Sequence, residues 1–215
     1  MNTEVLTPIL DLLDIVGIAL FALSGSVIAA KERQTFVTMC FFALVTGTGG
    51  GTVRDILIGT PVFWMQDFWY APVCLSMAAV IWQTPVRLWE GRFFAYADAA
   101  GLAAFSVLGS AKAVAYGVPP VPAMLMGVFT GVAGGIIRDA VASRSSLLME
   151  PELYITAATL SAVMTVLGMM AGPYVGIADA LIWTLAFSAG FALRIVALHY
   201  EISLPSYGRG APADE

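Results

Sequence analysis

Apolar residues occupy the chain in long runs, and short groups of polar residues separate these runs. A helix needs about 20 predominantly apolar residues to cross the hydrocarbon core of a membrane, because each residue adds about 1.5 Å. Seven runs meet this requirement, and we predict a membrane-spanning helix for each. They cover residues 10–30, 35–58, 70–88, 94–112, 120–142, 153–171 and 176–198. The pattern therefore predicts an all-α membrane protein.

An internal repeat extends over most of the chain. Residues 46–55 read Thr-Gly-Thr-Gly-Gly-Gly-Thr-Val-Arg-Asp, and residues 130–139 read Thr-Gly-Val-Ala-Gly-Gly-Ile-Ile-Arg-Asp. The two segments are 84 positions apart, and the same offset places Asp14 on Asp98 without a gap. A constant offset over so long a stretch indicates two copies of one structural unit.

This repeat constrains the topology. Each copy contains three predicted spans, an odd number, so the two copies must cross the membrane in opposite directions. We predict an inverted-topology repeat with copies at about 8–89 and 92–173, followed by a seventh helix at about 176–199 outside it. Residues 1–203 then form a single transmembrane domain. Residues 204–215, rich in Pro, Gly and Ala, are predicted to be a disordered cytoplasmic tail.

Composition supports the membrane assignment. Hydrophobic residues make up 59% of the chain and charged residues 12%, with a mean hydropathy of +0.85, which argues against a soluble globule. The first apolar run follows acidic Glu4 and Asp11 and no basic segment, so we do not expect a signal peptide. Cys40 and Cys74 lie inside predicted spans, which argues against a disulfide or a zinc site. We expect no cofactor, no metal and no nucleic-acid partner.

The basic residues predict the orientation. Arg54 and Lys112 fall on one side of the predicted spans, and the other eight basic residues fall on the opposite side. Cytoplasmic ends carry the excess of Lys and Arg, so we predict an external N-terminus and a cytoplasmic C-terminus. Aromatic residues around Phe63 fit a belt at the outer boundary. The eight are Lys31, Arg33, Arg87, Arg92, Arg138, Arg144, Arg194 and Arg209.

Glycines interrupt one predicted span in each half. Each glycine weakens a helix by about 1 kcal/mol relative to alanine, and freed backbone groups at that depth must face water or protein. We therefore interpret these glycines as kinks that line a cavity. Close packing of small residues, as with Gly47 and Gly51 four positions apart, is the alternative. The glycines are Gly47, Gly49, Gly50, Gly51, Gly131, Gly134 and Gly135.

Intramembrane charges are the second candidate feature. Such charges are costly, so they are normally functional and paired. Counting residues from the ends of the predicted spans gives Asp14 and Arg54 similar depths near the outer side of the membrane. The same count pairs Asp98 with Arg138 near the other side. The alternative is that these pairs are static pins between helices. The five carboxylates within or at the edge of spans are Asp14, Asp55, Asp98, Asp139 and Asp179.

Other chemistry is not supported. The glycine run at 47–51 lacks the Lys-Ser/Thr and the preceding strand of a phosphate-binding loop. No nucleophile stands beside a base, so we do not expect an enzyme. Serines such as Ser24 are interpreted as packing or pore-lining hydroxyls. The single histidine, His199, lies at the end of the seventh span, where we expect an interfacial residue.

Together, the seven spans, the inverted halves and the doubled Gly-Gly-x-x-Arg-Asp motif resemble the prokaryotic trimeric intracellular cation channels, a family also labelled as a glycine-transporter domain. The resemblance runs from about residue 8 to 198. It implies a homotrimer in the lipids of the bacterial inner membrane, in which each protomer conducts K⁺ and Na⁺ through its own pore. Kinked helices at 49–51 and 134–135 would line the pore, with Arg54 and Arg138 just beyond.

Two details depart from a simple match, and two other functions stay open. Ala133 stands where the first copy has Gly49, and Lys112 lies only near the position of a pore-associated basic residue in animal members. Carboxylates outnumber arginines five to two, which favours cations weakly. A secondary transporter of a small amino acid such as glycine would use the same repeats for alternating access. A purely structural membrane protein would use the charges as pins.

Overall fold

The computed structural model describes residues 3–144 and 153–204. Within these ranges the chain forms seven α-helices, with a single-turn helix before and another after α3. Six of the helices are long and apolar enough to cross a membrane, with the first such span at Leu12–Lys31. The helices are α1 (Thr3–Lys31), α2 (Phe36–Ile58), α3 (Tyr70–Gln83), α4 (Arg92–Ala115), α5 (Pro120–Val141), α6 (Tyr154–Val175) and α7 (Asp179–His199). The predicted all-α membrane fold is confirmed. The predicted tail after 204 lies outside the described residues.

The third predicted span, 70–88, is too long and needs correction. Helix α3 contains 14 residues and ends at Gln83, so it reaches only about 21 Å. Thr84 follows in an extended conformation (φ −117°, ψ 150°) because Pro85 disfavours helical geometry in the residue before it. A short helical turn at Val86–Leu88 then leads into α4.

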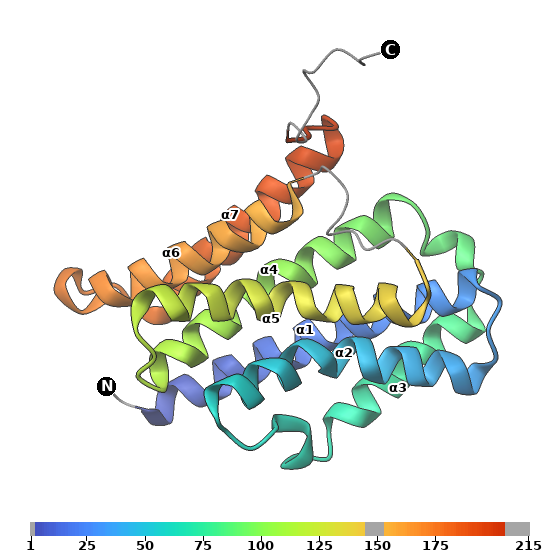
Figure 1. Cartoon of the computed structure of the whole chain (residues 1–215), viewed down its shortest axis with the longest axis horizontal. Helices are drawn as coiled ribbons and strands as arrows, with labels where there is room; N and C mark the ends of the chain where they lie inside the picture. The colour runs from blue at the N-terminus through green and yellow to red at the C-terminus, as the bar shows by residue number, and fades with distance from the viewer. Residues whose placement is uncertain (1–2, 145–152, 205–215) are drawn as a thin grey trace, which may run out of the picture.

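Four helices form the centre of the molecule. Helices α1, α2, α4 and α5 pack against one another, with α3 against α1 and α2 on one side and α6 against α4 and α5 on the other. Helix α7 packs on α4 and α6. Figure 1 shows this order, with the α6–α7 pair at the opposite side of the bundle from α3. The first two helices of each sequence half are therefore central, and the third is peripheral.

Packing within the two halves follows the same 84-residue offset as the sequence. A Cβ atom at Gly47 would lie 3.1 Å from the carbonyl oxygen of Ile18, so α1 and α2 approach closely there. The equivalent Cβ at Gly131 would lie 2.9 Å from the carbonyl oxygen of Leu102, where α4 and α5 meet. Glycine is required at both crossings because a side chain would collide with the neighbouring backbone.

The ends of α2 and α5 also match. Gly59 follows α2 with a left-handed backbone (φ 80°), and Ser143 occupies the equivalent position after α5 with φ 53°. In each turn the next residue donates its N–H to the carbonyl oxygen of an aspartate, Asp55 or Asp139, at 2.9 Å. Such turns satisfy carbonyls at the helix end, and here they fix the last turn that carries the Arg-Asp pair.

Candidate functional site

The first candidate cluster joins α1, near the start of its Leu12–Lys31 span, to the end of α2. Nη1 of Arg54 donates to Oδ1 of Asp14 at 3.2 Å, and Nε of Arg54 donates to Oδ1 of Asp55 at 2.8 Å. The Arg54 and Asp55 side chains are completely buried. A buried guanidinium is stable only with geometrically good partners, and Arg54 has two carboxylates. The predicted Asp14–Arg54 pair is confirmed.

Two further groups complete this cluster. Nζ of Lys112, on α4, donates to Oδ1 of Asp55 at 2.9 Å, and the lysine side chain remains 19% exposed. The backbone N–H of Phe63 donates to Oδ2 of Asp55 at 2.9 Å. The Phe63 ring also lies over the guanidinium of Arg54, with 5.5 Å between Cζ and the ring centroid. Phe63, which the sequence placed only in an aromatic belt, thus covers an ion pair.

The second cluster joins the start of α4 to the end of α5. Arg138 donates from Nη1 to Asp98 and from Nε to Oδ1 of Asp139, the latter at 2.8 Å. Nη1 also donates to Oγ of Ser24, on α1, at 3.0 Å. The ring of Phe94 lies 5.2 Å from Cζ of Arg138. The predicted Asp98–Arg138 pair is confirmed, and Ser24 is a partner that the sequence assigned only to packing or pore lining.

The clusters lie at different levels along α1, at Asp14 and at Ser24. Asp14 and Lys112 belong to the first cluster, so the part of α1 at Asp14 lies beside the end of α4. Ser24 and Asp98 belong to the second, farther along α1 and near the start of α4. Helices α1 and α4 therefore run antiparallel. The 84-residue offset places Ile28 at the position equivalent to Lys112, so the second cluster has no corresponding lysine at this position.

The central glycines bring α2 and α5 into contact. A Cβ at Gly50 would lie 2.5 Å from the carbonyl oxygen of Thr130, and one at Gly134 would lie 3.0 Å from that of Thr46. Both helices are continuous through their glycines. At both positions the absence of a side chain allows two backbones to approach, which favours the packing alternative, whereas the kinked, cavity-lining interpretation stays a prediction.

The other predicted glycines also lie against neighbouring atoms. A Cβ at Gly49 would lie 2.7 Å from Cδ1 of Ile137, and one at Gly51 would lie 2.5 Å from the Phe63 ring. A Cβ at Gly135 would lie 2.8 Å from the hydroxyl of Tyr154. Gly47 and Gly131 occupy the α1–α2 and α4–α5 crossings described above. All seven glycines thus stand at close contacts, as the packing alternative predicts.

Asp179, Arg194 and His199 lie outside the two clusters. Asp179 is the first residue of α7, where a carboxylate favours the helix N-terminus. Arg194 lies five residues before the end of α7 and is buried, and its Cζ lies 5.3 Å from the Tyr154 ring centroid. His199 ends α7 and is exposed, as expected of an interfacial residue.

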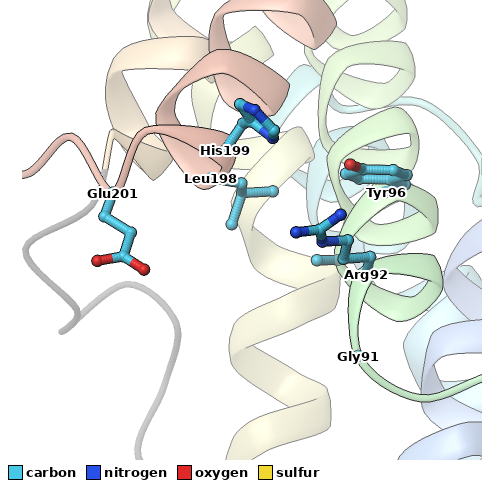
Figure 2. A pocket seen from close by; sticks show the side chains of 7 residues that line it. Gly91, Arg92, Tyr96, Leu198, His199 and Glu201 are labelled. Atoms are coloured by element: carbon cyan, nitrogen blue, oxygen red, sulfur yellow. The ribbon is translucent and has the colours of Figure 1, made fainter.

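A cavity of about 330 Å³ lies beside His199. It is lined by the start of α4 and the end of α7. Figure 2 shows Arg92 and Tyr96 on the α4 side, with His199 opposite them and Glu201 farther away. None of these residues takes part in the two arginine clusters among the described contacts. The cavity is therefore a separate feature of the surface.

Comparison with known proteins gives concordant results. The family model described as "Glycine transporter" matches the chain twice, at residues 11–85 and 95–170. A UPF0126 membrane protein of Vibrio cholerae is 33% identical over 213 residues, covering 96% of this chain and 86% of the relative. The UPF0126 inner membrane protein YadS of Escherichia coli is 39% identical over 155 residues, covering 70% of this chain and 74% of the relative.

Solved structures are similar as well. The trimeric intracellular cation (TRIC) channel orthologue from Rhodobacter sphaeroides matches with a TM-score of 0.82 and 34% identity, over 90% of this chain and 99% of the other. A prokaryotic TRIC channel crystallised in 0.5 M KCl matches with a TM-score of 0.81 and 28% identity, over 92% and 100%. The chain therefore belongs to the UPF0126 membrane-protein family, to which the glycine-transporter model corresponds, and its fold matches that of the prokaryotic TRIC channels.

Proposed function

We propose that this protein is a monovalent-cation channel that conducts K⁺ and Na⁺ along α1, α2, α4 and α5 of each protomer. The observation that carries the proposal is the likeness to the R. sphaeroides TRIC channel, at 34% identity over 90% of the chain. Two buried arginine–carboxylate clusters at different levels of the four-helix bundle support it, because polar groups within a membrane bundle mark ion pathways.

The two sequence halves are inverted copies related by a pseudo-two-fold axis in the membrane plane. The antiparallel course of α1 and α4 supports this relationship, as do the equivalent contacts of Gly47 and Gly131. The axis brings the same Arg-Asp motif to both mouths of the path. Arg54 with Asp55 faces the outside, and Arg138 with Asp139 faces the cytoplasm.

The charges of the clusters favour cations over anions. Their carboxylates are Asp14, Asp55, Asp98 and Asp139, and their cations are Arg54, Arg138 and Lys112. Each buried guanidinium contacts two carboxylates, so the arginines present no unpaired positive charge to a passing ion. Rings or pairs of carboxylates are the usual selectors for cations.

Assembly as a homotrimer in the bacterial inner membrane completes the proposal. The solved relative is itself a trimeric channel, and YadS is an inner membrane protein. Equivalent apolar side chains on α2 and α5 stay exposed in the isolated chain, including Val37 at 77% and Val121 at 66%. Lipid tails and neighbouring protomers are the partners that would cover such faces.

One alternative function has specific support. The description of the matching family model and the paired halves fit a secondary transporter of a small amino acid such as glycine. Purified protein in planar bilayers separates the two functions. A channel gives unitary K⁺ currents, whereas a carrier gives saturable glycine flux in proteoliposomes without unitary steps. Saturable flux with no unitary current would contradict the channel proposal.

A further inference from the structure

Two phenylalanine rings meet at the centre of the four-helix bundle. Phe21 on α1 and Phe105 on α4 are equivalent positions, 84 residues apart, and their ring centroids are 5.1 Å apart. Both side chains are completely buried. Equivalent residues of two related halves can touch only at the axis that relates the halves. The ring pair therefore marks the centre of the protomer.

Glycines surround the Phe105 ring. A Cβ at Gly17, on α1, would lie 2.5 Å from Cε1 of Phe105. A Cβ at Gly50, on α2, would lie 3.3 Å from Cδ2 of the same ring. The ring thus extends from α4 across to both α1 and α2, and there is no room for even a methyl group against it on the α1 side.

Phe21 has the equivalent surroundings. A Cβ at Gly101, on α4, would lie 3.5 Å from the Phe21 ring, and one at Gly134, on α5, would lie 3.4 Å from it. Each ring is therefore in reach of glycines on two other helices. Together the two rings fill the space where α1, α2, α4 and α5 converge.

The ring pair stands between the two charged clusters. Along α4, Phe105 lies seven residues after Asp98 and seven before Lys112, a separation of about 10 Å in each direction. Along α1, Phe21 lies between Asp14 and Ser24, which belong to opposite clusters. The rings occupy the centre of the four-helix bundle on the line between the two clusters.

We propose that Phe21 and Phe105 form a hydrophobic barrier that closes the ion path at its centre. This inference rests on the channel function proposed above. Apolar constrictions stop ions by excluding water, and they conduct when the side chains withdraw. The barrier consists of one ring from each half, so the halves contribute equally. Rotation of either ring away from the axis opens the path to water.

Single-channel recording on Phe21→Ala and Phe105→Ala tests the barrier. Each change is expected to raise the open probability about tenfold, because water enters an apolar constriction when it widens. The two variants are expected to act alike, since the positions are equivalent. Phe41→Ala, at a half-exposed ring on α2, is the matched control and is expected to leave open probability unchanged.

Leucine variants cover the case in which alanine prevents folding. Phe21→Leu and Phe105→Leu keep an apolar side chain and are expected to shift open probability in the same direction by a smaller factor. Wild-type open probability and unitary current in folded alanine or leucine variants would overturn the barrier while leaving the channel function intact. A silent wild-type protein, by contrast, would contradict the channel function itself.

Discussion

Lys112 at the end of α4 donates to Oδ1 of Asp55 on α2 at 2.9 Å, so a cation from the second half completes the charged cluster of the first. The equivalent position of the first half holds Ile28, and the second cluster gains a hydroxyl from Ser24 instead. The two ends of the proposed path therefore differ in charge although their Arg-Asp motifs are the same.

This difference predicts that Lys112→Met increases K⁺ conductance. The change removes a partly exposed positive charge from the outer end, so we expect unitary K⁺ current to rise by about twofold at low salt and by less at high salt, where charges are screened. Arg33→Met, in the exposed turn after α1, removes the same charge away from the clusters. Equal currents in both variants at low salt would contradict a role for Lys112 at the path.

The buried arginines are expected to dominate stability. Arg54→Met or Arg138→Met leaves two carboxylates without their shared partner, and breaking a buried ion pair costs about 3–5 kcal/mol of unfolding free energy. Arg138→Lys should recover only part of this loss, because one ammonium cannot replace the Nε and Nη1 contacts together. Melting in detergent measures the effect.

A surface arginine provides the control for that experiment. Arg144 pairs with Glu32 through an Nε–Oε1 distance of 3.6 Å, and both side chains are more than 40% exposed. Exposed pairs contribute about 0–1 kcal/mol, so Arg144→Met should melt close to the wild type. An Arg54 variant as stable as Arg144→Met would mean that its cluster contributes little to folding.

The sequence could predict the arginine pairs because helix rise converts position into depth. Counting residues along the predicted spans gives Asp14 and Arg54 similar depths from the same boundary, and buried charge requires a partner. The contact of Lys112 with Asp55 was not predictable in this way. The contact depends on how α4 packs against α2. Neither the hydrophobic periodicity of a helix nor the depth of a residue in the membrane specifies which helices of the two halves are neighbours.

Glycine was the less informative signal because it permits two opposite structures. The same residue weakens a helix and allows another backbone to approach. The opposing carbonyl oxygens show that Gly50 and Gly134 allow a close approach of backbones, which the sequence did not specify. The end of α3, by contrast, could have been predicted from Pro85. The prediction missed it because the apolar run continues past this proline.

Assembly gives a further prediction. The proposed trimer is expected to persist in mild detergent, because apolar side chains such as Val37 and Val121 stay exposed on an isolated chain. Light scattering with detergent correction, or native mass spectrometry, measures the protein mass against 22.7 kDa per chain. A monomer or dimer under conditions that retain conductance would contradict three-fold assembly.

Topology is testable with reporters at the two ends. The distribution of basic residues predicts an external N-terminus and a cytoplasmic C-terminus. The Glu32–Arg144 contact brings the turn after α1 close to the end of α5, so cysteines there should be labelled from the same, cytoplasmic side. Labelling of these two positions from outside the cell would show that the orientation is opposite to the predicted one. It would not affect the antiparallel course of α1 and α4.

The glycine crossing gives the final prediction. Gly50→Ala would place Cβ 2.5 Å from the backbone oxygen of Thr130, and backbone cannot yield as a flexible side chain can. Overpacking of this kind costs about 1–3 kcal/mol, which outweighs the gain of about 1 kcal/mol in helix propensity. Gly134→Ala should destabilise less, because its nearest atom, the oxygen of Thr46, lies 3.0 Å from the added Cβ.

Gly49→Ala is the matched control one position away. Its Cβ would meet only Cδ1 of Ile137, the movable end of a side chain, so alanine should be neutral or slightly stabilising. Thermal melting and single-channel current on the same three variants separate the roles of these glycines. Lower melting of Gly50→Ala with an unaltered unitary current assigns the crossing to helix packing alone. An altered current with unchanged melting would instead favour the kinked, pore-lining interpretation, because a tight backbone contact at Gly50 could not accept a methyl group without loss of stability.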